Sequence, residues 1–226
     1  MIKLGKAKVG TWVRLGWYGR AATMPVLWRV AGPIGDSSVR LVTAGVIDKA
    51  PFDGPSEVHP DGDNRWRDSS LRAWLNSSAP GNDPGFLHAF DARDVQALIE
   101  MEIETEVTTG YSAQRPPGID RTRDRVWVLS WEEYKKLPKT LRGGARSEAF
   151  TRDHPEELID NQIHWSRSPI TRFGIALLEH WEPKKEHTNS GASCEFAIRP
   201  CIALAAGSPL EGEGTEEAPY ERVSVH

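Results

Sequence analysis

The stretch Trp66-Arg-Asp-Ser-Ser-Leu-Arg-Ala-Trp-Leu-Asn76 predicts a short amphipathic helix. Leu71, Trp74 and Leu75 recur at the i, i+3, i+4 spacing that places three apolar side chains on one helical face. Trp66 adds a second large ring, and a packed tryptophan removes a large apolar area from water. We therefore expect this stretch to anchor the core, with Trp74 and Leu75 inside.

Polar residues mark both ends of the predicted helix. Ser69 or Ser70 can cap its start, because a hydroxyl oxygen accepts a hydrogen bond from an unpaired amide of the first turn. Asn76 can adopt the left-handed conformation that often ends a helix. We expect the helix to be bounded by these residues.

Three arginines lie inside apolar motifs, namely Arg72, Arg167 and Arg199. A planar guanidinium in such surroundings is expected to bind a carboxylate or backbone carbonyls and to hold loops against the core. Asp68 and Asp124 are the expected carboxylate partners. Capture of an external ligand by these arginines is the alternative interpretation.

The length of 226 residues suffices for one large domain or two small ones with a real core. Nine tryptophans are many for this length, and their spread indicates shared core packing rather than one binding strip. They include Trp28, Trp66, Trp74, Trp127 and Trp165. Stacking of an exposed tryptophan on a sugar or a base is the alternative.

The formal net charge of −4 gives no support for nucleic-acid binding. A local basic cluster at Arg121, Arg123 and Arg125 is interpreted as a solvated charged turn, because Asp120 and Asp124 lie beside it. The N-terminal residues lack the apolar segment of a signal peptide, and no stretch approaches the eighteen apolar residues of a membrane span. We therefore expect no membrane contact and no secretion through a signal peptide, which leaves the cytoplasm or an assembly formed there.

The remaining elements follow from alternation, turn residues and caps. Strands are predicted over residues 9–15, 25–30, 39–43, 103–109, 126–129 (buried) and 175–178. Helices are predicted over 92–101, capped by Asp91, and from the Ser130–Glu133 capping box. Polar loops are predicted over 48–65 and 111–120, and a surface excursion over 140–162. Residues 196–204 predict the final strand, in which Pro200 requires an edge position or a bulge. Residues 207–226 form an acidic tail that composition predicts to be disordered, so we expect one domain over 1–206 and an extended tail.

Five motifs occur in a characteristic order: residues 25–30, residues 66–76, residues 124–130 with Glu133, residues 165–168, and residues 198–204. In this order they resemble the bacterial and phage family DUF6273, a domain of unknown function. The resemblance implies an α+β fold similar to C-type lectin-like and formylglycine-enzyme-like domains, with a twisted antiparallel sheet, two to three short helices and long loops. It implies no activity.

The residues that carry the resemblance are expected to have structural roles. They are Trp28, Trp66, Leu71, Arg72, Trp74, Leu75, Asn76, Trp127, Ser130, Trp165, Arg167, Ser168, Arg199 and Pro200.

A metal site is the most tempting chemical interpretation. His180, His187, Cys194 and Cys201 follow one another at seven-residue spacing, but structural zinc sites usually contain a close pair such as C-x₂-C. Free cysteine, with Cys201 in a core strand, is the simpler interpretation. We expect no metal, no cofactor and no catalytic residue.

Three functions are consistent with the sequence. The first is a non-enzymatic binding or assembly domain, such as a capsid-decorating, tail or baseplate protein of a phage, which contacts other proteins through residues 207–226. The second is a carbohydrate- or peptide-binding module with a groove among residues 48–65, 111–120 and 140–162. The third is an enzyme of the formylglycine-generating type, which requires Cys194 and Cys201 to share a cleft.

Overall fold

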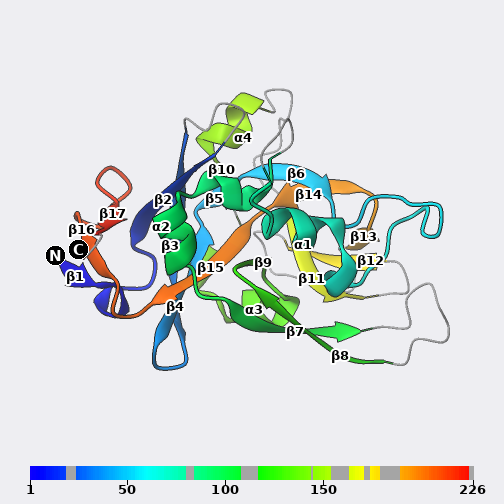
Figure 1. Cartoon of the computed structure of the whole chain (residues 1–226), viewed down its shortest axis with the longest axis horizontal. Helices are drawn as coiled ribbons and strands as arrows, with labels where there is room; N and C mark the ends of the chain where they lie inside the picture. Colours follow the sequence, from blue (N-terminus) through cyan, green and yellow to red (C-terminus); the bar gives the residue numbers. More distant parts are fainter. Residues whose placement is uncertain are drawn as a thin grey trace.

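The computed structural model describes residues 1–18, 24–79, 84–107, 117–143, 145–153, 163–170, 174–178 and 189–223. In these residues the chain is a sheet-rich α+β protein with short helices, as expected (Figure 1). Two larger sheets hold most of the strands, and two small pairs complete them.

The first sheet has eight strands in the order β1-β16-β17-β2-β3-β4-β15-β9. Their bounds are β1 Ile2–Lys3, β16 Pro209–Glu211, β17 Tyr220–Arg222, β2 Trp12–Tyr18, β3 Met24–Ile34, β4 Ser38–Thr43, β15 Pro200–Ala205 and β9 Val126–Val128. The second sheet has the order β13-β12-β11-β14-β6. Its strands are β13 Asn189–Gly191, β12 Gly174–Leu178, β11 His164–Pro169, β14 Glu195–Ile198 and β6 Asp48–Pro51.

The two small pairs are β7 Met101–Val107 with β8 Gly118–Asp124, and β10 Ala145–Arg146 with β5 Gly45–Val46. The helices are α1 Ser70–Leu75, α2 Ala92–Ala97, α3 Trp131–Lys136 and α4 Glu148–Asp153. Single turns of 3₁₀-helix are η1 Leu4–Lys6, η2 Trp66–Asp68, η3 Phe86–Ala89 and η4 Lys139–Leu141. The sheets are not purely antiparallel, because β17 pairs parallel with β2 and β11 pairs parallel with β14.

The core is rich in aromatic rings. Trp28, Trp66, Trp127 and Trp165 are fully buried, whereas Trp74 is half-buried. Each ring comes from a different element, so the core joins the two sheets to the segment that holds α1. The predicted sharing of core packing is therefore observed for the four buried rings. Leu75 is buried as expected, whereas Trp74, also expected inside, is only half-buried.

The predicted helix over residues 66–76 is divided in two. Trp66–Asp68 forms η2, and α1 begins only after Ser69, whose Oγ accepts a hydrogen bond from the Arg72 amide at 3.2 Å. Ser69 is thus the cap. The predicted helix over 92–101 ends at Ala97, because the Ile99 amide donates to the Ala203 carbonyl of β15 at 2.9 Å.

The prediction of one strand over residues 196–204 is wrong. The chain leaves the second sheet after Ile198 and enters the first at Pro200, so Arg199 lies at the crossing between sheets. Pro200 therefore starts a central strand instead of occupying an edge or a bulge. The predicted loops over 48–65 and 111–120 also contain strand residues, namely β6 and the start of β8.

The expectation of a disordered acidic tail is wrong for the described part of residues 207–226. β16 pairs with β1 and β17 pairs with β2, so both strands belong to the first sheet. Leu210 is fully buried in the core. Local composition is acidic, but the strands are stabilised by pairing with residues more than two hundred positions earlier.

Replacement of Leu210 by Ala tests this placement. A buried leucine that becomes alanine leaves a cavity and typically costs about 2–5 kcal/mol of unfolding free energy. We expect that loss in urea denaturation of Leu210→Ala, and a change within about 0.5 kcal/mol for Val58→Ala, whose side chain is largely exposed. Equal, small effects would mean that the tail is not part of the sheet.

Candidate functional site

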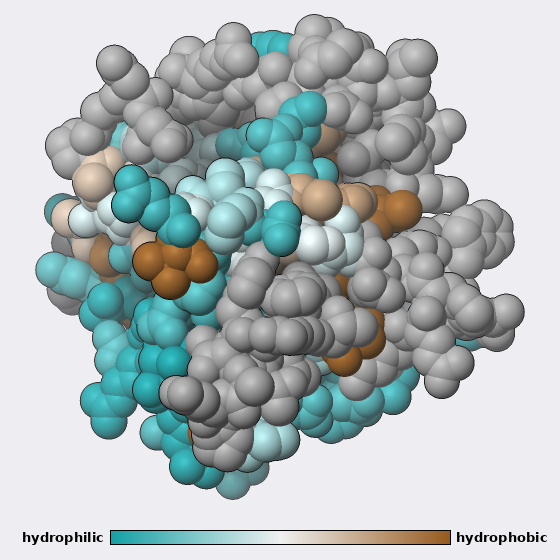
Figure 2. Space-filling view, turned by 90° about the vertical axis from the view of Figure 1, so that its right-hand side faces the viewer, coloured by the Kyte–Doolittle hydropathy of each residue, from teal (hydrophilic) through white to brown (hydrophobic). Residues whose placement is uncertain are grey.

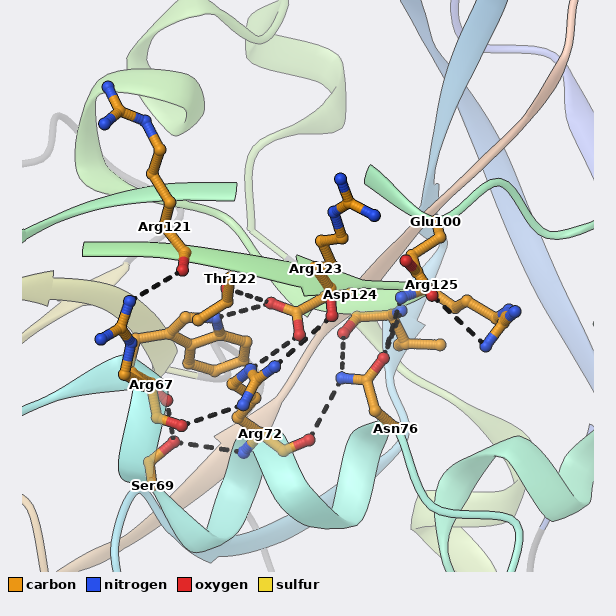
Figure 3. A network of polar contacts seen from close by, with 12 residues as sticks. Arg67, Ser69, Arg72, Asn76, Glu100, Arg121, Thr122, Arg123, Asp124 and Arg125 are labelled. Atoms are coloured by element: carbon orange, nitrogen blue, oxygen red, sulfur yellow. Dashed lines mark hydrogen bonds and ion pairs between the residues drawn. The ribbon is translucent and has the colours of Figure 1, made fainter. Parts of the chain in front are cut away.

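Asp124, at the end of β8, is the centre of a polar network around α1 (Figure 3). Its side chain is fully buried and accepts hydrogen bonds from Arg72 Nε at 2.7 Å, Trp66 Nε1 at 3.0 Å and Thr122 Oγ1 at 2.6 Å. A buried carboxylate is costly unless a cation and hydrogen-bond donors compensate for lost water. The expected pairing of Arg72 with Asp124 is therefore observed, and it joins η2 and α1 to the β7–β8 ribbon.

Asn76 joins the end of α1 to the start of β9 (Figure 3). Its Nδ2 donates to the Arg72 and Val126 carbonyls at 3.1 and 2.8 Å, and its Oδ1 accepts from the Arg125 and Val126 amides at 2.9 and 3.1 Å. The backbone at Asn76 has φ −103° and ψ 12°, so the predicted left-handed conformation is wrong. The Asn76 backbone amide donates to the Arg72 carbonyl at 3.1 Å, so the backbone and the side chain together close the end of the helix.

A second carboxylate of β8 binds the segment before α1. Asp120 accepts hydrogen bonds from Arg65 Nε and from Arg65 Nη2, the latter at 2.9 Å. This bonding raises the pKa of Arg65. Asp68, expected as a partner of a motif arginine, pairs instead with Arg65 at 3.2 Å.

The basic cluster lies on a strand rather than in a turn. Arg121 and Arg123 belong to β8, opposite Glu104 and Glu102 of β7. Arg121 Nη2 lies 2.7 Å from Glu104 Oε1, and both side chains are mostly exposed. The expected solvated character is thus correct, although the expected turn is not.

Glu133 forms the second internal network. It completes the predicted capping box, in which its Oε2 accepts from the Ser130 amide at 2.9 Å and Ser130 Oγ accepts from the Glu133 amide at 3.1 Å. Glu133 also pairs with Arg40 at 3.0 Å and with Arg167. Burial alone would raise the pKa of this carboxyl, but Arg167, then Arg40 and the Ser130 amide, outweigh burial and hold the pKa below its usual value.

Two further motif residues complete this network. Arg167 Nη1 donates to the Val128 carbonyl at 2.8 Å, which ties β11 to β9. Ser168 Oγ accepts from the Trp131 amide at 3.0 Å at the start of α3. Glu133, Arg167 and Ser168 therefore fix α3 against strands of both larger sheets.

Arg199 fixes the crossing between the sheets. Its guanidinium donates to the Thr43 carbonyl at 2.9 Å and to the Leu141 carbonyl at 2.8 Å, and burial lowers its pKa to about 10. No carboxylate in the described ranges lies within ion-pair distance of it. The backbone carbonyls are the partners that the apolar motif predicted.

The two cysteines occupy different environments. Cys201 is fully buried in β15, opposite Val42 and Trp127, and burial raises the pKa of its thiol to about 12. Cys194 is exposed in the turn between β13 and β14. His180 and His187 lie outside the described residues. Among described residues, no group of three or more His, Cys, Asp or Glu is placed to hold a metal ion.

A pocket of about 290 Å³ lies between α1 and β6. It is lined by Asp48, Ala50, Pro51, Ser70, Leu71, Trp74 and Ile198. Leu71 and Ile198 are buried, Asp48 and Trp74 are half-buried, and Ser70 is exposed.

Two residues that line the pocket, Asp48 and Trp74, are held in place by contacts outside it. The Tyr18 hydroxyl and the Lys49 amide donate hydrogen bonds to the Asp48 carboxylate. Trp74 Nε1 donates to the Pro84 carbonyl at 3.1 Å, and the Trp74 and Tyr18 rings meet edge to face with centroids 6.2 Å apart. Sequence reasoning singled out Trp74 but not Asp48, because the lining comes from three segments that only the folded chain brings together.

The described surface offers little continuous apolar area on the face in Figure 2. Most described residues there are hydrophilic, and hydrophobic ones form separate spots. The large apolar residues that are exposed among the described ones, apart from Met1, are Val9, Trp17, Val58 and Ile119. No helix in the described ranges is long and apolar enough to cross a membrane.

These features define a sheet-rich α+β domain in which Asp124, Glu133 and Arg199 are engaged in internal contacts and a small pocket lies beside α1. The model of the family described as "Domain of unknown function (DUF6273)" matches residues 38–206, and the chain belongs to this family. Four of the five motifs lie inside the matched residues, and the motif at 25–30 precedes them. Neither a curated protein nor a solved structure matches the chain.

The Asp124 network predicts unequal effects for two similar arginines. Arg72→Met leaves the buried Asp124 carboxylate without its cation, so we expect a loss of about 3–5 kcal/mol of unfolding free energy. Arg121→Met removes an exposed pair with Glu104, for which we expect a change below about 1 kcal/mol. Urea denaturation at neutral pH measures both, and similar losses for the two variants would contradict the assigned role of Asp124.

Proposed function

We propose that this chain is a non-enzymatic binding domain, on a scaffold similar to C-type lectin-like domains, that joins other proteins in a larger assembly. The phage association of the family favours a virion as the setting, with the chain as a capsid-decorating, tail or baseplate protein. The main observation in favour of this proposal is the pocket between α1 and β6. Asp48 and Trp74, which line it, are held in place by contacts within the chain that need no ligand.

The surroundings of the thiol, carboxylate and guanidinium groups support the non-enzymatic part of this proposal. A catalytic thiol needs a lowered pKa and access to substrate, whereas Cys201 is buried with a pKa raised to about 12. Asp124 and Glu133 bind arginines inside the protein, and Arg199 binds carbonyls. Groups of this kind stabilise the scaffold and leave the surface for binding.

In this proposal the contact segment is not residues 207–226, the segment that composition suggested. Residues 209–211 and 220–222 pair within the chain's own first sheet. A partner that used these residues would have to bind them as part of that sheet. The pocket beside α1 is therefore the preferred contact site in this proposal.

A carbohydrate-binding module is the second candidate. Trp74 favours it, because an aromatic ring at the rim of a pocket can stack on a sugar. Of the three segments in which a groove was expected, residues 48–51 contribute to the pocket, while 111–116 and 154–162 lie outside the described residues. A formylglycine-generating type of enzyme has less support, because Cys194 is exposed in a turn and Cys201 is buried in a strand.

Binding of the full chain to two arrays tests the proposal. One array carries overlapping peptides from proteins encoded in the same genome, and the other carries glycans. We expect a defined set of peptides to retain the chain, and mass spectrometry to recover these peptides unchanged.

Three results would contradict the proposed function. Chemical modification of many peptide molecules by one protein molecule would indicate an enzyme. Binding to glycans alone would favour the second candidate. Absence of any binder above background on both arrays would contradict both binding functions.

A further inference from the structure

We infer that two copies of this chain form a symmetric dimer through the outer face of β2 and β3, with the acidic loop of residues 212–219 of each copy against that face of the other. Six side chains make up the outer face, namely Trp12, Arg14, Trp17, Pro25, Leu27 and Arg29. Contact between copies of one chain is not part of the proposed function, which concerns other proteins.

The pairing of β2 with β3 places these six side chains on one side of the first sheet. The opposed pairs are Trp12–Arg29, Arg14–Leu27 and Trp17–Pro25. Opposed residues of paired strands point to the same side of a sheet, and so do residues two positions apart along one strand. The pairing is irregular between residues 14 and 17, so Trp17 stays on the outer side while Tyr18 packs against the core.

The apolar side chains of the outer face lie outside the core. Along β3, buried residues alternate with half-buried ones, and the half-buried ones include those of the outer face. Trp12 and Leu27 are half-buried, yet neither is among the described apolar residues that pack on the core. Trp17 is 49% exposed, and it is the one aromatic ring among the large apolar side chains that the described residues expose. Tryptophan and arginine are enriched among the residues that dominate the binding energy of protein interfaces, so the outer face has an interface composition.

Arg29 gives the outer face a positive charge. Its guanidinium carbon lies 4.3 Å from the centroid of the Trp12 ring, and its Nε donates to the Gly10 carbonyl at 2.6 Å. Among the described residues no carboxylate forms an ion pair with Arg29, whereas Arg14 already pairs with Glu221. The two contacts of Arg29 hold the guanidinium in place and leave its Nη nitrogens as donors for a carboxylate.

The loop between β16 and β17 brings negative charge beside this face (Figure 1). The Trp12 amide donates to the Gly214 carbonyl at 3.0 Å, so the loop lies against the start of β2. Burial lowers the pKa of Arg29, and the charge of Glu216 partly offsets this effect, so the loop approaches Arg29 without pairing with it. The loop has three glutamates, all exposed, namely Glu213, Glu216 and Glu217.

These neighbouring surfaces of opposite charge make the chain complementary to itself. A second copy related by a two-fold axis presents its loop to the outer face and its own outer face to the loop, so one arrangement forms the same contact twice. A wholly acidic partner would be repelled by the loop, and a wholly basic one by Arg29. A second copy carries both charges in the required places and is therefore the occupant that fits.

Sedimentation equilibrium of the full chain, with mixing of two charge variants, tests this inference. We expect the unaltered chain to form a dimer as its concentration rises. Arg29→Glu and the double variant Glu216→Arg with Glu217→Arg each set like charges against each other, so each alone should weaken dimerisation at least tenfold. An equimolar mixture of the two should restore the dimer, because every altered group then meets the opposite charge on the other copy.

A substitution of an exposed side chain covers the case in which a charge variant does not fold. Trp17→Ser removes the exposed ring and should weaken dimerisation at least tenfold. Val58→Ser changes another exposed apolar residue, in the segment between β6 and η2, and should leave dimerisation unchanged within twofold. Circular dichroism verifies that each variant is folded.

Three results would overturn the inference. A chain that stays monomeric up to about 1 mM has no self-association of useful strength. A dimer that Trp17→Ser leaves unchanged uses another surface, and folded charge variants that do not recover on mixing do not meet across a dimer. Each of these results leaves peptide binding by the chain unaffected, so failure of the dimer and failure of the proposed function are distinguishable.

Discussion

Asp124 carries its negative charge where its side chain is out of contact with water, and three donors compensate for the lost hydration. Trp66 donates from η2, Arg72 from α1 and Thr122 from β8 itself, so the carboxylate determines how these elements meet. A displaced donor would leave a buried charge partly unsolvated, and the resulting cost is several kcal/mol. Asn76 adds one hydrogen bond to Arg72 of α1 and three to Arg125 and Val126 at the start of β9, and so fixes the other end of the same helix.

The two other internal networks follow the same principle. Glu133 binds arginines from β4 and β11, while Arg199 binds carbonyls at the end of β4 and within η4. Polar groups therefore orient the helices and the crossing between the sheets, while the tryptophans supply buried apolar area. This arrangement also shapes the pocket, because α1 supplies Ser70, Leu71 and Trp74 to its wall. The internal charges thus act on binding indirectly, through the position of α1.

Local chemistry predicted the features that depend on a few neighbouring residues. The Ser130–Glu133 capping box, the Asp91 cap and the Ser69 cap were all predictable because each joins residues three positions apart. The partner of Arg72 was predicted only as one of two carboxylates, and the fold brings Asp124 to Arg72 while Asp68 pairs with Arg65. Strand order was not predictable from local patterns, since β6, β14, β16 and β17 pair with distant segments. The pocket escaped prediction for the same reason, because β6, α1 and β14 meet only in the folded chain.

Native-state hydrogen exchange at the Arg125 and Val126 amides tests most directly whether the Asp124 and Asn76 network holds the fold together. Asn76 Oδ1 accepts hydrogen bonds from both amides, so they can exchange only when α1 separates from β9. We expect their exchange free energy to equal the free energy of global unfolding, and to match that of the amides between β3 and β4. Exchange at a clearly lower free energy, with β3 and β4 still protected, would show that the network opens locally and would contradict its central role.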